Sequence, residues 1–187
     1  TAVSRRSLGK RFASASIRIA LYSVLAYGPS TFAGTIVRIS TGIGDYSIEL
    51  FDDSAPGTVQ NFLNYVNRND YNGTYIHRAV DNFVVQGGGY GFLLYEGPID
   101  VPGDPPIQNE FGASNTRGTV AMAKVAGDPD SATNQWFVNI ADNSATLDTD
   151  NGGFTVFGVV LGAGMITVDE IDALPVVNLG AKAISAP

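Results

Sequence analysis

The chain has 187 residues, which is the size of one ordinary domain and is enough to bury a hydrophobic core. Its residues are 44% hydrophobic and 16% charged, with 22 glycines, and this composition indicates a turn-rich, strand-rich globular protein. A net charge of −7 at pH 7 argues against nucleic acid as a partner, because that binding depends on Lys and Arg at phosphates. The sequence has no cysteine and one histidine, His77, so thiolate chemistry and Cys- or multi-His metal sites are excluded and no metal is expected.

The first 33 residues differ in charge from the rest of the chain. They contain five basic residues and no acidic one, and the short apolar run Ile19–Ala26 follows the basic positions. Together with the small residue Ala33, this pattern is typical of a secretory signal peptide, which would make the protein periplasmic or secreted. The alternatives are an amphipathic surface helix, an organellar transit segment or a misassigned start, and without a signal peptide we expect a cytoplasmic protein. The sequence therefore predicts an N-terminal segment over 1–33 and one domain over 34–187.

The domain begins with a predicted hairpin, because Gly34–Thr41 and Asp45–Phe51 alternate apolar and polar residues around a glycine-rich turn. Helical spacing of apolar residues predicts helices over Thr58–Arg68 and Met165–Leu174, and Gly97–Pro106 is expected to be a loop. Further strands are predicted at Tyr75–Val80, Phe83–Gly87, Thr119–Lys124, Trp136–Ile140 and Thr155–Leu161. Many strands with two widely separated helices fit a closed antiparallel barrel, capped at its ends, better than a βαβ sheet.

One stretch, TYIHRAVDNFVVQGGGYG at Thr74–Gly91, resembles the central signature of the cyclophilins, in which His and Arg precede a Phe and then Gln-Gly-Gly. The resemblance covers about Gly34 to Leu174, and the connection between Gly91 and Asn109 is similar in length to that of the bacterial branch. It continues, in the family's order, through NEF at Asn109–Phe111, NTRGTVAMAK at Asn115–Lys124, NQWFVNIADN at Asn134–Asn143, LD at Leu147-Asp148 and FTVFGVV at Phe154–Val160. The resemblance implies a closed, eight-stranded antiparallel β-barrel capped by two α-helices, and peptidyl-prolyl cis/trans isomerase activity without a cofactor.

Isomerisation of a peptide bond makes few chemical demands. Amide resonance resists rotation with a barrier of about 18–20 kcal/mol, and uncatalysed exchange at proline takes tens of seconds or longer. No bond is broken, so a catalyst needs no nucleophile, metal or general base. It needs an apolar socket for the proline ring, a strong donor near the prolyl nitrogen and hydrogen bonds to the flanking backbone.

The resemblance implies three residues that carry catalysis. Arg78 matches the catalytic arginine, whose permanent charge and rigid donors suit the prolyl nitrogen; its alternative role is a surface or barrel-end ion pair. Gln86 matches the glutamine that orients this arginine and contacts substrate, and its alternative is a polar residue of the barrel interior. His77 is predicted to hydrogen bond in the substrate floor and not to act as a base, with a purely structural histidine as the alternative.

The same resemblance implies the substrate-binding residues. Ala123 and Lys124 match the strand edge that pairs with substrate backbone, where the family usually has Asn in place of Lys124, and Gln135 matches a residue of the same wall. Trp136 is expected near the site without lining the proline pocket. The pocket itself is predicted to be lined by Phe83, Val84, Phe137, Leu147 and Phe154, each of which is otherwise ordinary barrel core.

Partners follow from the same reasoning. We expect proline-containing peptides and unfolded client proteins, bound by a monomer. Ciclosporin is expected to bind weakly, because Thr146 stands where the family often has a large aromatic residue. Two other functions remain open: a non-catalytic module that binds proline peptides in the same pocket, and a lipocalin-type barrel, which needs a continuous apolar lumen. The presence of Arg78 together with Gln86 and Phe83 favours the enzyme.

Overall fold

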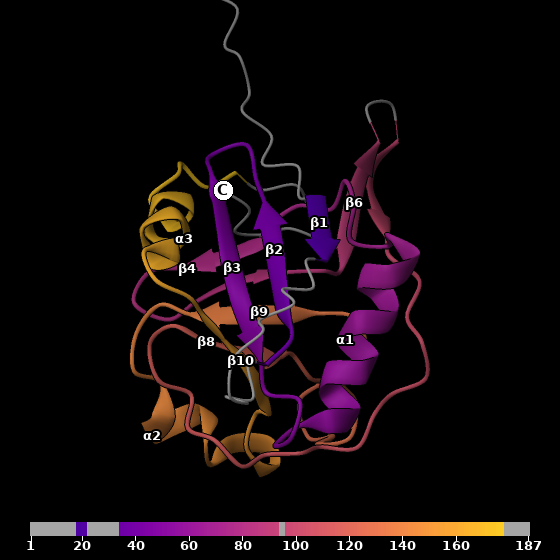
Figure 1. The fold of residues 1–187 in the computed structure, drawn as a ribbon, viewed down its shortest axis with the longest axis vertical. Coiled ribbons are helices and arrows are strands. Elements are labelled where there is room, and N and C mark those ends of the chain that lie inside the picture. Colours follow the sequence, from indigo (N-terminus) through magenta and orange to yellow (C-terminus); the bar gives the residue numbers. More distant parts are fainter. Residues whose placement is uncertain (1–17, 22–33, 94–95, 178–187) are drawn as a thin grey trace, which may run out of the picture.

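The computed structural model describes residues 18–21, 34–93 and 96–177. Its main element is an eight-stranded antiparallel sheet with the strand order β1-β2-β3-β10-β8-β9-β5-β4 (Figure 1). These strands are, in chain order, β1 (Arg18–Leu21), β2 (Ile36–Ser40), β3 (Asp45–Leu50), β4 (Arg78–Val80), β5 (Val84–Gly87), β8 (Thr119–Met122), β9 (Trp136–Asn139) and β10 (Val156–Val160). A separate hairpin is formed by β6 (Tyr90–Leu93) and β7 (Gly97–Asp100).

The sheet curls strongly, with its helices on opposite sides (Figure 1). The helices are α1 (Pro56–Arg68), the short α2 (Ser144–Leu147) and α3 (Gly164–Asp172), with a 3₁₀ turn at Asp150–Gly152. The prediction of an eight-stranded antiparallel barrel is confirmed in kind, but closure is overstated, because β1 and β4 are not paired with each other within the described ranges. Residues 178–187, where a last strand would follow, lie outside those ranges.

The N-terminal segment is described only at β1, which pairs antiparallel with β2 and places Ile19 opposite Ile39. This strand takes up the start of the apolar run Ile19–Ala26. The signal-peptide prediction otherwise falls on residues outside the described ranges and stays a prediction. Among the described residues, no helix combines the length and apolarity that crossing a membrane requires.

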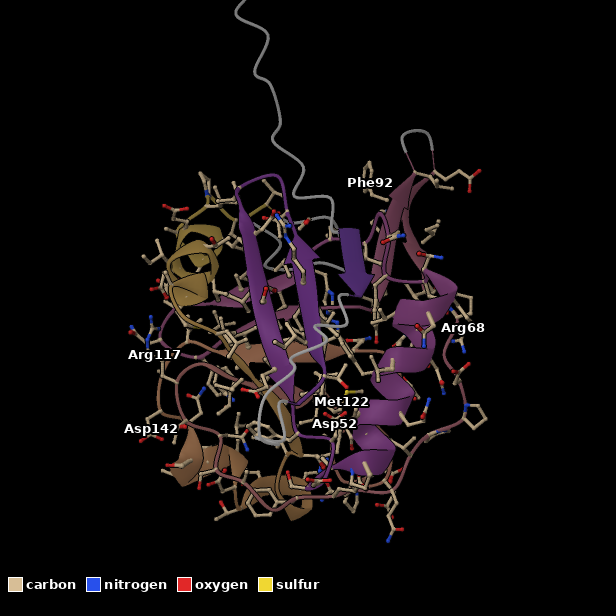
Figure 2. The ribbon with its side chains drawn as sticks, in the orientation of Figure 1. Asp52, Arg68, Phe92, Arg117, Met122 and Asp142 are labelled. Atoms are coloured by element: carbon tan, nitrogen blue, oxygen red, sulfur yellow. The ribbon has the colours of Figure 1, made fainter. Side chains whose placement is uncertain are left out.

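Side-chain alternation along the strands separates two apolar clusters, one on each face of the sheet. The inner cluster packs around Phe62 of α1, whose ring contacts the rings of Trp136 and Phe157 at centroid distances of 6.3 and 5.1 Å. Met122 belongs to it and lies in the middle of the molecule, whereas Phe92 lies on the projecting β6–β7 hairpin (Figure 2). The outer cluster has a buried floor of Val84, Ala121, Phe137, Leu147 and Val156.

Because successive strand residues point to opposite faces, Trp136 is fully buried inside while its neighbour Phe137 faces outward. The expectation that Trp136 lies beside the site without lining the pocket agrees with this placement.

Helix α1 begins where the sequence predicts within two residues, and a distant carboxylate fixes its start. Pro56 occupies the first turn, and Glu110 accepts hydrogen bonds from the backbone N–H groups of Gly57 and Thr58 at 3.0 and 2.7 Å. Partial burial acts to raise the pKa of Glu110, but the hydrogen bonds from Thr58 and Gly57 outweigh it and lower the pKa. The helix ends at Asn69, which is left-handed with φ 62°.

Other features of the fold also differ from the sequence prediction, which has two helices and contains neither β6 nor the short helix α2. The predicted loop Gly97–Pro106 contains β7, and the predicted strand Tyr75–Val80 becomes regular only at Arg78. His77, just before β4, still forms a backbone hydrogen bond across to β5, because its N–H donates to the Gln86 carbonyl at 3.1 Å.

Candidate active site

One row of directly opposed residues crosses five strands on the outer face of the sheet. Arg78 on β4 lies opposite Gln86 on β5, and Gln86 lies opposite Phe137 on β9. Phe137 is opposite Ala121 on β8, which is opposite Val156 on β10. Opposed residues of an antiparallel sheet have Cβ atoms about 4.5–5.5 Å apart, so the register joins a charged end and an apolar end into one surface.

The polar end of the row is a chain of three side chains. The Arg78 Nη1 donates to the Gln86 Oε1 over 3.4 Å, and the Gln86 Nε2 donates to the Gln135 Oε1 at 2.9 Å. The Arg78 guanidinium also lies 5.6 Å from the centre of the Phe83 ring. Partial burial lowers the pKa of Arg78, but an arginine keeps its charge at any physiological pH. The structure therefore places a fixed cation at the edge of the apolar cluster.

His77 lies behind this polar chain. It is 5% exposed, and its ring meets the Tyr90 ring edge-to-face at 4.8 Å. Burial lowers the pKa of His77 to about 4, opposed by a hydrogen bond with Gln135 and assisted by the charge of Arg78. The imidazole is therefore neutral at pH 7, and its position suits a support for Gln135 better than direct contact with a peptide. Its predicted role in the substrate floor stays a prediction.

The five predicted pocket residues lie together in the outer cluster. Phe137 and Leu147 are 4% and 6% exposed and form part of the floor with Val84. Phe83 and Phe154 are only partly buried, and the Phe154 ring meets the Phe137 ring edge-to-face at 6.0 Å. A buried floor with aromatic walls is suited to a small apolar ring.

The predicted peptide edge, Ala123 and Lys124, follows β8. The Ala123 N–H donates to the Gln135 carbonyl at 2.9 Å, so this group is already paired within the sheet, and the pairing of this edge with a peptide stays a prediction. The Lys124 side chain turns toward the loop after α2, where Nζ donates to the carbonyls of Asn151 and Gly153 at 2.9 and 2.7 Å. The same ammonium lies 4.8 Å from the Phe154 ring centre. Its charge thus ties the Phe154 wall to β8, a role that the sequence did not indicate.

Sequence reasoning also missed three buried asparagines behind the pocket walls, Asn115, Asn139 and Asn143. All three belong to the motifs NTRGTVAMAK and NQWFVNIADN. The available signal was Asn139 itself, since an amide inside an otherwise apolar strand requires buried partners.

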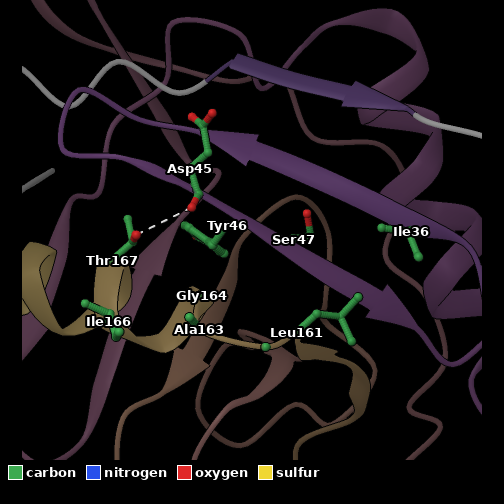
Figure 3. Close-up of a pocket in the computed structure, with 10 residues that line it drawn as sticks. Ile36, Asp45, Tyr46, Ser47, Leu161, Ala163, Gly164, Ile166 and Thr167 are labelled. Carbon is green, nitrogen blue, oxygen red and sulfur yellow. Dashed lines mark hydrogen bonds between the residues drawn. The ribbon is translucent and has the colours of Figure 1, made fainter.

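A hollow of about 630 Å³ lies between β3 and the start of α3, away from the outer-face row (Figure 3). None of the predicted site residues lines it, and its one charged residue, Asp45, forms an ion pair with Arg38. Within the described ranges, no group of His, Cys, Asp or Glu side chains could hold a metal ion. The outer-face row is therefore the better candidate for the active site.

The fold and these contacts define a β-barrel-like protein with an aromatic socket beside a cationic donor. Residues 36–185 match the model of the family described as cyclophilin type peptidyl-prolyl cis-trans isomerase/CLD. The chain is 42% identical over 151 residues to the peptidyl-prolyl cis-trans isomerase of Acinetobacter baylyi, covering 79% of this chain and 77% of that protein. It is 38% identical over 179 residues to peptidyl-prolyl cis-trans isomerase A of Dickeya dadantii, covering 92% and 90%.

Among solved structures, the fold matches a cyclophilin type peptidyl-prolyl cis-trans isomerase of Cryptosporidium parvum, solved in the presence of the dipeptide Ala-Pro. The TM-score is 0.62 at 23% identity, with 80% of this chain and 90% of that chain covered. The chain therefore belongs to the cyclophilin-type peptidyl-prolyl cis-trans isomerases, and its activity is the isomerisation of peptide bonds that precede proline.

Proposed function

We propose that the outer-face row holds the proline ring in the aromatic socket while Arg78 stabilises the twisted amide. Twisting the bond breaks amide resonance and leaves a lone pair on the prolyl nitrogen. A guanidinium donor at that nitrogen stabilises the twisted state more than either planar state, which is the condition for acceleration. About 1.36 kcal/mol of this preference gives each tenfold gain in rate.

Gln86 acts as a positioning residue for Arg78 in this proposal. Its amide oxygen accepts from Arg78 and its amide nitrogen donates to Gln135, so the side chain is held at both ends. An amide fixed in this way directs the guanidinium toward the socket. The reaction moves no proton between protein and substrate, so His77 has no need to titrate during turnover.

The observation that supports the assignment is the cross-strand register, which brings Arg78 and Phe137 onto one face through Gln86. Measuring cis/trans exchange of a short Ala-Pro peptide by NMR, with and without the purified protein, tests it. Acceleration by catalytic amounts of protein is expected. A folded protein that binds the peptide without accelerating exchange would instead be a proline-peptide binding module.

The partners in this proposal are proline-containing peptides and unfolded client proteins, which the chain binds as a monomer. The Ala-Pro dipeptide named with the Cryptosporidium parvum relative supports the first of these. Thr146 is exposed on α2 and offers little apolar area, which supports weak binding of ciclosporin. If residues 1–33 act as a signal peptide, the clients are periplasmic or secreted proteins.

A further inference from the structure

Three asparagine side chains are buried together behind the walls of the proline socket. Asn115 and Asn139 are fully buried and Asn143 is 7% exposed. They come from separate places: the approach to β8, the end of β9 and the residue that precedes α2. Burying an amide is unfavourable unless its donors and acceptors form hydrogen bonds. The hydrogen-bond partners of the three amides therefore identify the parts of the site that they fix in place.

The three amides bond to one another in a chain. The Asn143 Nδ2 donates to the Asn139 Oδ1 at 2.7 Å, and the Asn139 Nδ2 donates to the Asn115 Oδ1 at 3.2 Å. A second bond runs from the Asn139 Nδ2 to the Thr119 Oγ1 at 2.9 Å and attaches the chain to β8. Each amide therefore uses its oxygen or nitrogen to fix the orientation of the next.

The two ends of this chain bond to the backbone of the socket walls. At one end, the Asn143 Nδ2 also donates to the Phe83 carbonyl at 2.8 Å, behind the aromatic ring that lies beside Arg78. At the other end, the Asn115 Nδ2 donates to the Phe154 carbonyl at 3.0 Å. The backbone carbonyls of Phe83 and Phe154 are thus joined through three buried side chains.

Leu147, in the floor of the socket, is held by backbone hydrogen bonds to Asn143 and to Phe154. Its N–H donates to the Asn143 carbonyl at 2.8 Å, and its carbonyl accepts from the Phe154 N–H at 2.8 Å. The next residue, Asp148, accepts from both the N–H and the Nδ2 of Asn115 at 2.8 and 2.9 Å. The carbonyls of Phe83 and Phe154 are therefore one hydrogen bond away from the amide chain, whereas Leu147 is bonded to the backbone of Asn143 and Phe154 and not to a side-chain amide.

We infer that Asn143, Asn139 and Asn115 form a positioning network that sets the spacing of the two aromatic walls of the socket, Phe83 and Phe154. The inference rests on the proposed function, because it gives the network a role in proline binding and not only in folding. The two ends of the network position different walls of the socket. The Asn143 side chain holds Phe83 beside Arg78, whereas the Asn115 side chain holds Phe154, beside Phe137, and is itself fixed by Asp148.

This difference gives the test. Asn143→Ala is expected to lower kcat on an Ala-Pro peptide by about tenfold, because displacing Phe83 misplaces the cation next to the prolyl nitrogen. Asn115→Ala is expected to raise KM by about tenfold with kcat little changed, because it loosens the wall without moving the donor. Asn64→Ala is the matched control, because it removes an exposed hydrogen bond between the side-chain amides of Gln60 and Asn64 on α1. This variant should change neither kcat nor KM.

A conservative pair checks that hydrogen bonding carries the effect. Asp148→Asn keeps an acceptor for Asn115 and should behave like the unmodified protein, whereas Asp148→Ala should reproduce the KM increase of Asn115→Ala. Equal changes of kcat and KM in both asparagine variants would overturn the division of roles. Unchanged constants in folded variants would leave the network purely structural and overturn the inference.

A measurement on the unmodified protein covers the case in which a variant does not fold. The side-chain amide resonances of Asn115 and Asn143 should shift when an Ala-Pro peptide is titrated to saturation, because the walls they hold contact the ring. Resonances that stay fixed at saturation overturn the inference. Since this protein is active in the same sample, failure of the network is distinguished from failure of the proposed function.

Discussion

Arg78 and Gln86 lie directly opposite each other on β4 and β5, and the arginine Nη1 donates to the glutamine Oε1 over 3.4 Å. Gln86 in turn lies opposite Phe137 on β9, so the polar and apolar halves of the site meet through one residue. A one-residue slip of β5 would turn Gln86 to the inner face and bring Val85 outward. The register of β5 therefore decides whether the donor reaches the socket.

Replacing Arg78 by Ala should remove most of the isomerase activity, on the order of a hundredfold or more, because it deletes the donor for the prolyl nitrogen. The fold should persist, since Arg78 is only partly buried and its hydrogen bond to Gln86 is long. NMR exchange on an Ala-Pro peptide measures the loss, and circular dichroism checks the fold. Arg38→Ala, at the ion pair with Asp45, is the control and should stay active. Near-normal catalysis by folded Arg78→Ala would show that the donor is another group.

Much of the fold could be predicted from the spacing of apolar residues and from the residue types that form turns, because both patterns are local in the sequence. The helix over Thr58–Arg68 and the first hairpin have clear patterns, and both occur within two or three residues of the prediction. The β6–β7 hairpin was missed because Gly91, Gly97 and Pro98 are poor strand residues, and their pairing with one another outweighs that preference.

The site was predictable only through the family resemblance. Arg78, Phe137 and Val156 are far apart in sequence, and periodicity says nothing about which strands become neighbours. The buried amides were not predicted because asparagine is mostly exposed, and the burial of Asn139 depends on Asn115 and Asn143 arriving from other segments. Such tertiary pairing has no local signature.

Acid should destabilise the protein through His77. Burial lowers the pKa of this imidazole from 6.5 to about 4, so between these pH values the unfolded state binds more protons than the folded state. The contribution of His77 is therefore fully present above about pH 6.5 and is lost as the pH falls toward 4. The loss approaches about 3 kcal/mol, since each pKa unit corresponds to about 1.36 kcal/mol.

Urea unfolding at pH 7 and pH 4.5, compared between the unmodified protein and His77→Gln, measures this loss. The variant lacks the titrating group and should lose less stability between the two pH values. Burial raises the pKa of Asp172, which favours the folded state in acid, but this effect is common to both proteins and cancels in the difference. Equal losses in the two proteins would contradict the assignment to His77.

Glu110 should stabilise the fold without contributing to catalysis. Glu110→Ala leaves the N–H groups of Gly57 and Thr58 at the start of α1 without their carboxylate partner. Loss of a helix cap costs about 1–2 kcal/mol, so the midpoint of thermal unfolding should fall by several degrees. Glu110→Gln keeps one acceptor oxygen and should lose less. The kcat/KM at 10 °C should be unchanged in both folded variants, and a large drop would place Glu110 in the catalytic machinery.

The small side chain of Thr146 should weaken inhibitor binding without lowering the turnover of a short peptide. Family members bind ciclosporin across the proline pocket and the adjoining wall, and Thr146 stands where the resemblance places a large aromatic residue. Losing a buried aromatic contact at an interface costs on the order of 2 kcal/mol or more, which is more than tenfold in affinity. The unmodified protein should therefore bind ciclosporin weakly while it isomerises a short peptide, because that peptide depends on the socket around Phe83 and Phe137.

Thr146→Trp should tighten ciclosporin binding at least tenfold and leave turnover of a short Ala-Pro peptide nearly unchanged. Titration calorimetry measures the first effect and NMR exchange the second. Ala145→Trp is the matched control, because Ala145 is also exposed on α2 but points about 100° away around the helix, so an indole there should not tighten binding. Equal tightening by the two variants would indicate non-specific apolar contact. Low-nanomolar binding by the unmodified protein would show that Thr146 is not part of the wall that the inhibitor contacts.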